Sequence, residues 1–323
     1  MSHVLILGGA GYVGLALGQA LVRSGNCIVF ATTRDASKSN TLLSNEITPL
    51  VGNLSDADFI KTVIAKHRID VVVDLSQAYA DATTILNTVV EAAKARASAL
   101  AADDSVGPKL GFIYTSGTWV NGSTRDHQVS DTTVPGTSLA VDKPATAVAW
   151  RPAHEQAVLR ARDALDVAVL RPGAVYGRGS WVWGLYWSKV LAATQDGQSG
   201  EDIAIPADAD TRTGVVHVDD IADAFVKAIG SMHNLGSWPV YDVVSETVSL
   251  TVVLEKVKRI LGATGKLSYV GTHGDAFLEA LALVTNASSA RARIELGWTP
   301  KRREFVRDLP QLVAAWQASQ PGQ

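Results

Sequence analysis

The stretch LILGGAGYVG at residues 5–14 constrains the fold more than any other part of the sequence. An apolar run that predicts a buried strand is followed by Gly8, Gly11 and Gly14, and a segment with helical periodicity begins at once. Glycines at such a junction permit a tight turn and let the backbone approach a pyrophosphate closely. The N–H groups of the helix N-terminus then attract the anion. The stretch predicts a dinucleotide-binding unit, and the alternative is a tight turn without a ligand.

The same alternation continues through the first two-thirds of the chain. Apolar runs typical of strands are separated by segments in which apolar residues recur at helical spacing, and this pattern indicates βαβ units and a parallel sheet. We therefore expect an α/β fold with a Rossmann-type doubly wound parallel sheet. The expected strands are HVLILG (3–8), CIVFAT (27–32), VVVDLS (71–76), GFIYTS (111–116) and DVAVLRP (166–172).

Helices and one long loop are expected between and after these strands. Apolar spacing predicts helices over residues 82–97 and 152–165, and residues 121–149 carry Gly, Pro, Ser, Thr and Asp without periodicity. A long loop in a compact domain is more often functional than idle. Further along, VVHVDDIADAFVKAI predicts a helix with Asp219 or Asp220 as its N-cap.

Composition excludes several classes of protein. The chain of 323 residues is 47% hydrophobic and 19% charged, with a net charge of -3 and no long basic run, so neither nucleic acid nor a membrane surface is an expected partner. The single cysteine, Cys27, excludes an internal disulfide framework. No segment has the length of apolar sequence that spans a bilayer, and no His, Cys and carboxylate grouping has metal-ligand spacing. We expect a cytoplasmic protein without a metal.

The end of the second expected strand bears on which nicotinamide cofactor would bind. An acidic residue at this place holds the adenosine ribose diol and repels a 2′-phosphate. Thr32, Thr33 and Arg34 stand there instead, and two hydroxyls with a guanidinium suit a phosphate. Asp35 is a competing charge, and an ordinary surface loop is the alternative. We expect NADP(H) in preference to NAD(H).

Several motifs, in order along nearly the whole chain, resemble those of the extended short-chain dehydrogenase/reductases. That group contains the sugar-nucleotide epimerases and dehydratases. Besides the glycine-rich stretch, the similar motifs are GNLSD (52–56), YTSGTWVNG (114–122), LRPGAVYGRG (170–179), GVVHVDDIADA (214–224) and ARIELGWTPK (292–301).

The resemblance implies how the chain is organised. It implies a dinucleotide-binding domain over residues 1–177, to which 214–245 returns, and a smaller C-terminal substrate lobe formed by 178–213 and 246–323. It also makes a homodimer a possible assembly. The glycine-rich motif, the second strand end and the resemblance together predict these cofactor-binding residues: Gly8, Gly11, Tyr12, Val13, Gly14, Thr32, Thr33, Arg34, Asn53, Leu54, Leu75, Ser76, Pro172 and Val175.

The chain departs from the family pattern where a proton is handled. The resemblance implies an acidic tyrosine, a lysine four residues later and a Ser or Thr at the earlier strand end, but Ala147, Arg151 and Gly117 occupy these places. None of the tyrosines has a lysine four residues later. Pro152 is expected to push Arg151 out of the helical region, which would keep it from lying one helical turn after Ala147. Residues 118–119 are Thr-Trp where the dehydratases have Asp-Glu, so that subclass is disfavoured.

Five side chains are candidates for catalysis in place of the missing ones. Ser116 and Thr118 follow a strand and could orient a carbonyl. Tyr79, which the resemblance places on a loop above the nicotinamide, is a surrogate proton donor, with packing as the alternative. Arg151 could bind a ribose or a substrate carboxylate, or lie on the surface. His154 titrates near neutrality and could be a general acid or base, or simply be solvated.

Four aromatic residues fall where the substrate lobe is expected to begin: Trp181, Trp183, Tyr186 and Trp187. They suit a flat or apolar substrate, and the alternatives are a lobe core or a dimer contact. We expect an atypical NADP(H)-binding reductase that transfers hydride to a carbonyl or imine of a small aromatic or apolar molecule. The alternatives are a cofactor-binding regulator or sensor without turnover, and a non-redox isomerase or cyclase.

Overall fold

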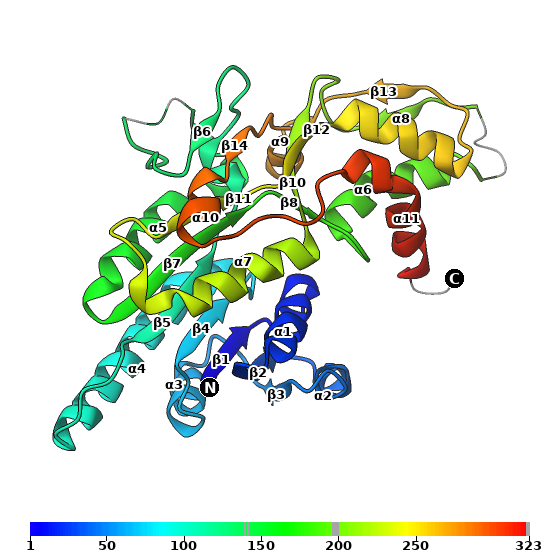
Figure 1. The fold of residues 1–323 in the computed structure, drawn as a ribbon. Helices are drawn as coiled ribbons and strands as arrows, with labels where there is room; N and C mark the ends of the chain where they lie inside the picture. The colour runs from blue at the N-terminus through cyan, green and yellow to red at the C-terminus, as the bar shows by residue number, and fades with distance from the viewer. Residues whose placement is uncertain (139, 141, 196–199, 321–323) are drawn as a thin grey trace.

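The computed structural model is shown in Figure 1 and describes nearly all of the chain. A few residues of the expected loop and of the expected lobe segments lie outside the described part. The described residues are 1–138, 140, 142–195 and 200–320.

Within these residues, seven parallel strands form the central sheet. The strand order reverses beside β1, as in a doubly wound fold, and the expected Rossmann-type α/β class is confirmed. From edge to edge the strands are β3 (Thr48–Val51), β2 (Cys27–Thr33), β1 (Ser2–Leu7), β4 (Val71–Asp74), β5 (Leu110–Thr115), β7 (Leu165–Pro172) and β11 (Val240–Val243).

The central strands are apolar on both faces because both faces are covered. Successive side chains of a strand point to opposite sides, so Val4 and Ile6 of β1 join one hydrophobic cluster, and Leu5 and Leu7 join another. All four side chains are fully buried. This explains why the sequence of the strand is a continuous apolar run.

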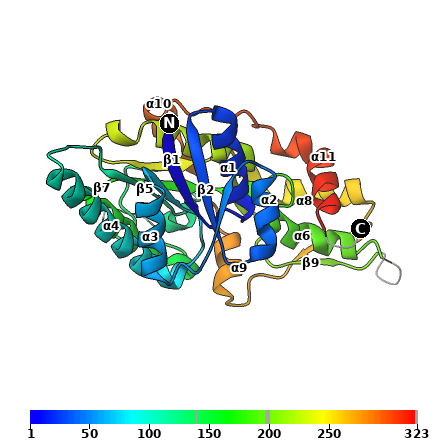
Figure 2. The same ribbon diagram turned by 90° about the horizontal axis from the view of Figure 1, so that it is seen from below.

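Helices cover the two faces of the sheet. α1 (Tyr12–Ser24) and α7 (Val218–Gly230) pack together over one face. α3 (Ala57–Lys66), α4 (Ala82–Ala102) and α5 (Arg151–Arg160) cover the other, with α3 and α4 side by side in Figure 2. Because the strands of the sheet are parallel, their carboxyl ends all lie at the same edge, where a ligand site is expected.

The start of α5 corrects one expectation. Arg151 is the first residue of the helix, although Pro152 follows it, so the proline does not push Arg151 out of the helical region. Trp150 is already helical, at φ -78° and ψ -25°, and a proline in the first turn lacks only an N–H that has no partner there. The helix ends at Arg160, and Leu165 belongs to β7.

The start of α7 corrects a second expectation. Its N-cap is His217, whose Nδ1 accepts a hydrogen bond of 3.1 Å from the Asp219 N–H, rather than Asp219 or Asp220. The Asp220 carboxylate accepts backbone hydrogen bonds of 2.9 Å from Lys301 and Arg302. Asp220 therefore fastens the C-terminal segment to α7.

The remaining elements surround a separate hydrophobic cluster, and the helices among them lie at the right of Figure 1. Its helices are α6 (Trp181–Ala192), α8 (Leu250–Leu261) and α11 (Phe305–Ala318). Its strands are β8 (Ala174–Tyr176), β10 (Arg212–His217), β12 (Glu246–Ser249), β9 (Ile203–Ile205) and β13 (Leu267–Tyr269). Short elements complete the structure: α2 (Ser39–Leu43), α9 (Ala276–Leu281), α10 (Ala290–Glu295), β6 (Val129–Ser130) and β14 (Ala287–Ser288).

None of the helices in the described ranges is long and apolar enough to cross a membrane. The same ranges hold no group of three or more His, Cys, Asp and Glu residues that could bind a metal ion.

Candidate active site

A cleft of about 790 Å³ opens at the carboxyl ends of the parallel strands. Residues that follow β1, β2, β4, β5 and β7 all line it, so the cleft spans the point where the strand order reverses. Its volume is within the ordinary range for a small-molecule or cofactor site. This cleft is the candidate active site.

The glycine-rich turn forms one end of the cleft. Gly8 has φ +77°, and a Cβ atom there would lie 2.7 Å from the Ser76 Cα. A Cβ on Gly14 would lie 2.4 Å from the Gly8 carbonyl oxygen. Gly11 is the N-cap of α1 and has no side chain to occupy the first N–H groups of the helix. The turn is thus a backbone cradle that side chains would fill, and it fits a pyrophosphate.

The end of β2 is basic on the side that faces the cleft. Arg34 and Lys38 line the cleft and are exposed. Asp35 accepts hydrogen bonds from the Ser37 hydroxyl and N–H, at 2.6 and 2.9 Å, and these bonds hold the pKa of its carboxyl below the usual range. The carboxylate caps the following turn, and Asp35 also lines the cleft beside the two cations. Lys38 was not among the residues expected from the sequence.

Thr32 and Thr33 have a structural role at the same strand end. Thr32 is buried, and its Oγ1 accepts a hydrogen bond of 3.0 Å from the Gly8 N–H. This bond fastens the glycine-rich turn to β2. Thr33 is also buried, and its Oγ1 accepts the N–H of Asp35 at 3.1 Å.

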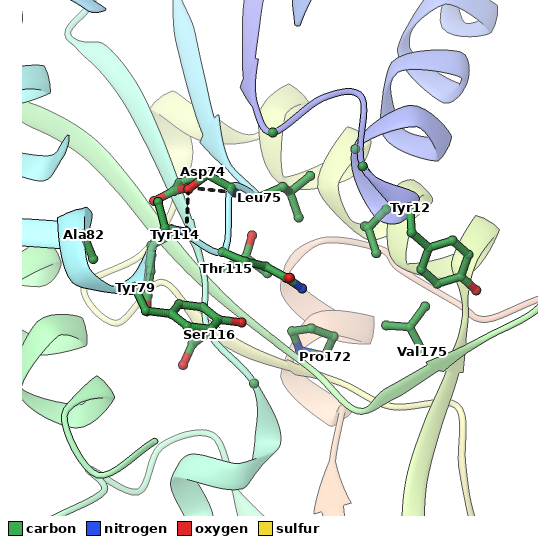
Figure 3. Close-up of a pocket in the computed structure, with 18 of the residues that line it drawn as sticks. Tyr12, Asp74, Leu75, Tyr79, Ala82, Tyr114, Thr115, Ser116, Pro172 and Val175 are labelled. Atoms are coloured by element: carbon green, nitrogen blue, oxygen red, sulfur yellow. Dashed lines mark hydrogen bonds between the residues drawn. The ribbon is translucent and has the colours of Figure 1, made fainter. Parts of the chain in front are cut away.

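The structure brings the expected cofactor-binding residues together around the cleft. Figure 3 shows Tyr12, Pro172 and Val175 facing the cleft from one side, and Leu75 near the glycine-rich turn. The expected residues that line the cleft are Gly8, Gly11, Tyr12, Val13, Gly14, Thr32, Thr33, Arg34, Asn53, Leu54, Leu75, Ser76, Pro172 and Val175.

Four of the five expected catalytic side chains line the other end of the cleft. Ser116 and Thr118 are buried there, beyond the end of β5. Tyr79 is 47% exposed, and Figure 3 shows its ring reaching into the cleft. The Arg151 guanidinium lies over that ring, 4.8 Å from its centroid. These side chains come from three separate segments of the chain, which only the sheet brings together.

His154 lies outside the cleft. It is buried behind Tyr114, with the two ring centroids 4.6 Å apart in an edge-on arrangement. Burial lowers the pKa of the imidazole, so the neutral ring is favoured. The geometry excludes direct proton transfer to a ligand in the cleft, and the solvated position that was its alternative is also wrong. The buried side of α5 includes Arg151, His154 and Glu155, and apolar spacing does not reveal a buried side made of polar residues.

Gly117 and Arg151, two of the departures from the family pattern, lie against each other in the structure. A Cβ atom on Gly117 would lie 3.1 Å from Nη1 of Arg151, closer than an ordinary van der Waals contact. The guanidinium therefore occupies the space that a side chain at position 117 would need. Ala147, in the short turn before α5, also lines the cleft and leaves room there.

Two residues at this end were not singled out from the sequence. The Asp74 carboxylate, at the end of β4, accepts the Ser76 N–H at 3.0 Å and the Ser76 hydroxyl at 2.7 Å, the bonds dashed in Figure 3. Burial raises the pKa of Asp74. Tyr114 lines the cleft beside it, and burial raises the pKa of its phenol, which keeps its proton. Polar residues at the ends of apolar strands were the signal available in the sequence.

The aromatic walls of the cleft differ from those expected. Of the four aromatics at residues 181–187, Trp181 lines the cleft, whereas Trp183, Tyr186 and Trp187 are buried in the core around α6. For these three the alternative of a lobe core holds rather than contact with a substrate, because α6 packs that side against α8 and α11. Aromatic residues from other segments complete the walls: Trp119, Trp150 and Phe277.

A buried ion network lies beneath the end of the cleft that Ser116, Thr118 and Arg151 line. Arg171 of β7 is fully buried and donates hydrogen bonds of 3.0 and 2.5 Å to the Glu155 carboxylate. Its Nη1 lies 3.7 Å from Oδ1 of Asp242 on β11. Asn121, three residues after Thr118, donates a bond of 3.3 Å to the other Asp242 oxygen. The network ties α5, β7 and β11 together below the residues that line the cleft.

The doubly wound sheet, the backbone cradle and the cleft at the reversal of strand order define a Rossmann-type dinucleotide-binding fold. The family model of the NAD dependent epimerase/dehydratase family matches residues 4–243. The chain therefore belongs to this family, as the sequence motifs indicated. No curated protein matches the sequence significantly.

Solved structures of sugar-nucleotide enzymes share the fold over almost the whole chain. UDP-glucuronic acid 4-epimerase from Bacillus cereus, in complex with UDP-glucuronic acid and NAD, is 16% identical with a TM-score of 0.73, over 98% of this chain and 100% of that one. UDP-glucose 4-epimerase from Thermotoga maritima is 17% identical with a TM-score of 0.72, over 98% of this chain and 99% of that one. dTDP-glucose 4,6-dehydratase from Bacillus anthracis is 16% identical with a TM-score of 0.70, over 99% of this chain and 98% of that one. At such identities the likeness shows the fold alone.

Proposed function

We propose that the chain binds NADP(H) and reduces a carbonyl or imine of a small, flat organic molecule. The observation that carries the proposal is the single cleft, which joins a backbone cradle and a basic strand end to a group of hydroxyls and aromatic rings. Arg34 and Lys38 suit a 2′-phosphate, and the Asp35 carboxylate is engaged with Ser37. The structures of the Bacillus anthracis dehydratase and the Bacillus cereus epimerase are complexes with NAD, so cofactor preference is the first point to test.

A reduced nicotinamide bound in the cleft would supply a hydride to the substrate carbon. The chain would supply the rest of the chemistry. Ser116 and Thr118, which line the cleft, would orient the carbonyl oxygen or imine nitrogen by hydrogen bonding. The Tyr79 hydroxyl would donate the proton that this atom takes up, and the rings of Trp119 and Trp181 would hold a flat substrate.

A specific observation favours a second candidate function, namely nucleotide binding without turnover or with non-redox chemistry. Ala147 and Arg151 stand where the family resemblance implies the acidic tyrosine and its lysine. A regulator or sensor would then distinguish oxidised from reduced cofactor, and an isomerase or cyclase would form product without a change in nicotinamide absorbance.

The test is calorimetric titration of the chain with NADPH, NADP⁺, NADH and NAD⁺, followed by absorbance at the nicotinamide band with carbonyl and imine substrates. We expect NADPH to bind more tightly than NADH, and Arg34→Ala to bring the two affinities together. Arg23→Ala, a basic residue in the last turn of α1 away from the cleft, is the matched control. Binding of none of the four nucleotides would refute the cofactor assignment. Binding without any absorbance change would favour the second candidate.

A further inference from the structure

Arg151 is a buried cation to which the described residues give no ion pair. Arg151 is 7% exposed, and its Nε atom is buried and has no hydrogen-bond partner among the described residues. Carboxylates in the same region are already engaged, Glu155 with Arg171 and Asp74 with Ser76. Burial of a charge is costly unless a counter-charge compensates it. The guanidinium is therefore free to bind an anion that enters the cleft.

The surroundings of the guanidinium fix it without neutralising it. It lies 4.8 Å from the ring centroid of Tyr79 and 5.8 Å from that of Trp150, and Gly117 leaves it space on a third side. Aromatic faces attract a cation but carry no net charge. Because Arg151 lines the cleft, the remaining approach to its N–H groups is from the cleft itself.

An aromatic wall lines the same cleft. Trp181 and Phe277 are nearly parallel, with centroids 5.9 Å apart and planes at 20°, and Trp119 meets Phe277 edge-on at 5.8 Å. All three residues line the cleft. Rings arranged in this way offer an apolar surface that suits a flat group.

We propose that the substrate is an aromatic carboxylic acid, whose carboxylate binds Arg151 and whose ring packs against the wall formed by Trp119, Trp181 and Phe277. A planar guanidinium matches a carboxylate with two parallel hydrogen bonds. The cofactor does not supply this anion, because its anionic groups belong at the glycine-rich turn and at Arg34, and its nicotinamide ribose carries neutral hydroxyls. The assignment of the remaining space to a substrate rests on the proposed function.

The experiment separates charge from shape with two probes of the same size. Indole-3-acetate and the neutral indole-3-acetamide are titrated calorimetrically into the chain, with and without saturating NADP⁺. The variants are Arg151→Gln, Arg151→Lys and the matched control Arg160→Gln, which changes an exposed arginine on the same helix. UDP is titrated as a phosphate anion, and thermal unfolding is recorded without ligand.

We expect the wild type and Arg160→Gln to bind the acid at least tenfold more tightly than the amide. Arg151→Gln should bind the two equally, and Arg151→Lys should retain part of the preference. Without ligand, Arg151→Gln should unfold at the same temperature as the wild type or a higher one, since an uncompensated buried charge is removed. That result also shows that the variant is folded.

Four results would overturn the proposal. They are equal binding of acid and amide by the wild type, binding of neither probe, a preference for the acid that survives in Arg151→Gln, and Arg151-dependent binding of UDP that is tighter than that of the acid. Loss of NADP⁺ affinity in Arg151→Gln with the acid preference intact would assign Arg151 to the cofactor ribose. Failure of the cofactor proposal is read separately, because the preference is also measured without nucleotide.

Discussion

The carboxyl of Asp242 gives the sharpest test of the buried network beneath the site. Burial raises the pKa of Asp242 from 3.8 to about 7, even though the Arg171 guanidinium 3.7 Å away lowers it. Below about pH 7 the folded chain therefore holds this proton, whereas the unfolded chain releases it near pH 3.8. The folded state binds more protons in between, so the free energy of unfolding must fall as pH rises through this range.

The size of the effect follows from the two pKa values. At about 1.4 kcal/mol for each tenfold change in proton affinity, the step from 3.8 to about 7 amounts to roughly 4 kcal/mol. Asp242→Asn keeps the shape of the protonated side chain and cannot ionise. We expect the variant to match the wild type near pH 4 and to exceed its stability progressively up to pH 8, by as much as this amount.

The assay is urea unfolding of the wild type and Asp242→Asn at a series of pH values from 4 to 8. Asp163→Asn, which removes an exposed carboxyl, corrects for the general effect of one negative charge. A difference that does not change with pH, or a wild type that gains stability relative to Asp242→Asn as pH rises, would refute the reasoning. It would show that Asp242 is ionised and held by Arg171 in the folded chain.

Two further predictions concern the cradle and the aromatic residues. Gly14→Ala places a Cβ 2.4 Å from the Gly8 oxygen, so calorimetry should show nucleotide affinity reduced at least tenfold, whereas Gly236→Ala, with open space around it, should bind normally. Trp183→Ala empties a fully packed site and should lower the free energy of unfolding by about 3–5 kcal/mol. Trp181→Ala, at a site 46% exposed, should cost less than about 1 kcal/mol in the same urea titration while weakening the binding of flat ligands. Equal losses from the two tryptophan variants would contradict the assignment of Trp183 to a core and Trp181 to the cleft.

The sequence by itself determined the sheet and the cradle, because both have local signatures. Buried strand segments such as 4–7 are continuous apolar runs, and the spacing of Gly8, Gly11 and Gly14 reflects a turn that a side chain would block. The edge strand at 48–51 has a weaker signal, since it is short, contains a proline and is not fully buried.

Only the tertiary structure decided which side chains meet around Arg151 in the cleft. The guanidinium of Arg151 fills the space beside Gly117, and Tyr79 covers it, although the three residues lie on segments far apart in the chain. Likewise, burial between packed strands raises the pKa of Asp242, and Arg171 on the neighbouring strand opposes this only in part. Contacts between distant segments follow from how strands and helices pack and leave no periodicity or spacing in the sequence. The scaffold is therefore encoded locally, whereas the chemistry of the cleft arises only where these segments meet.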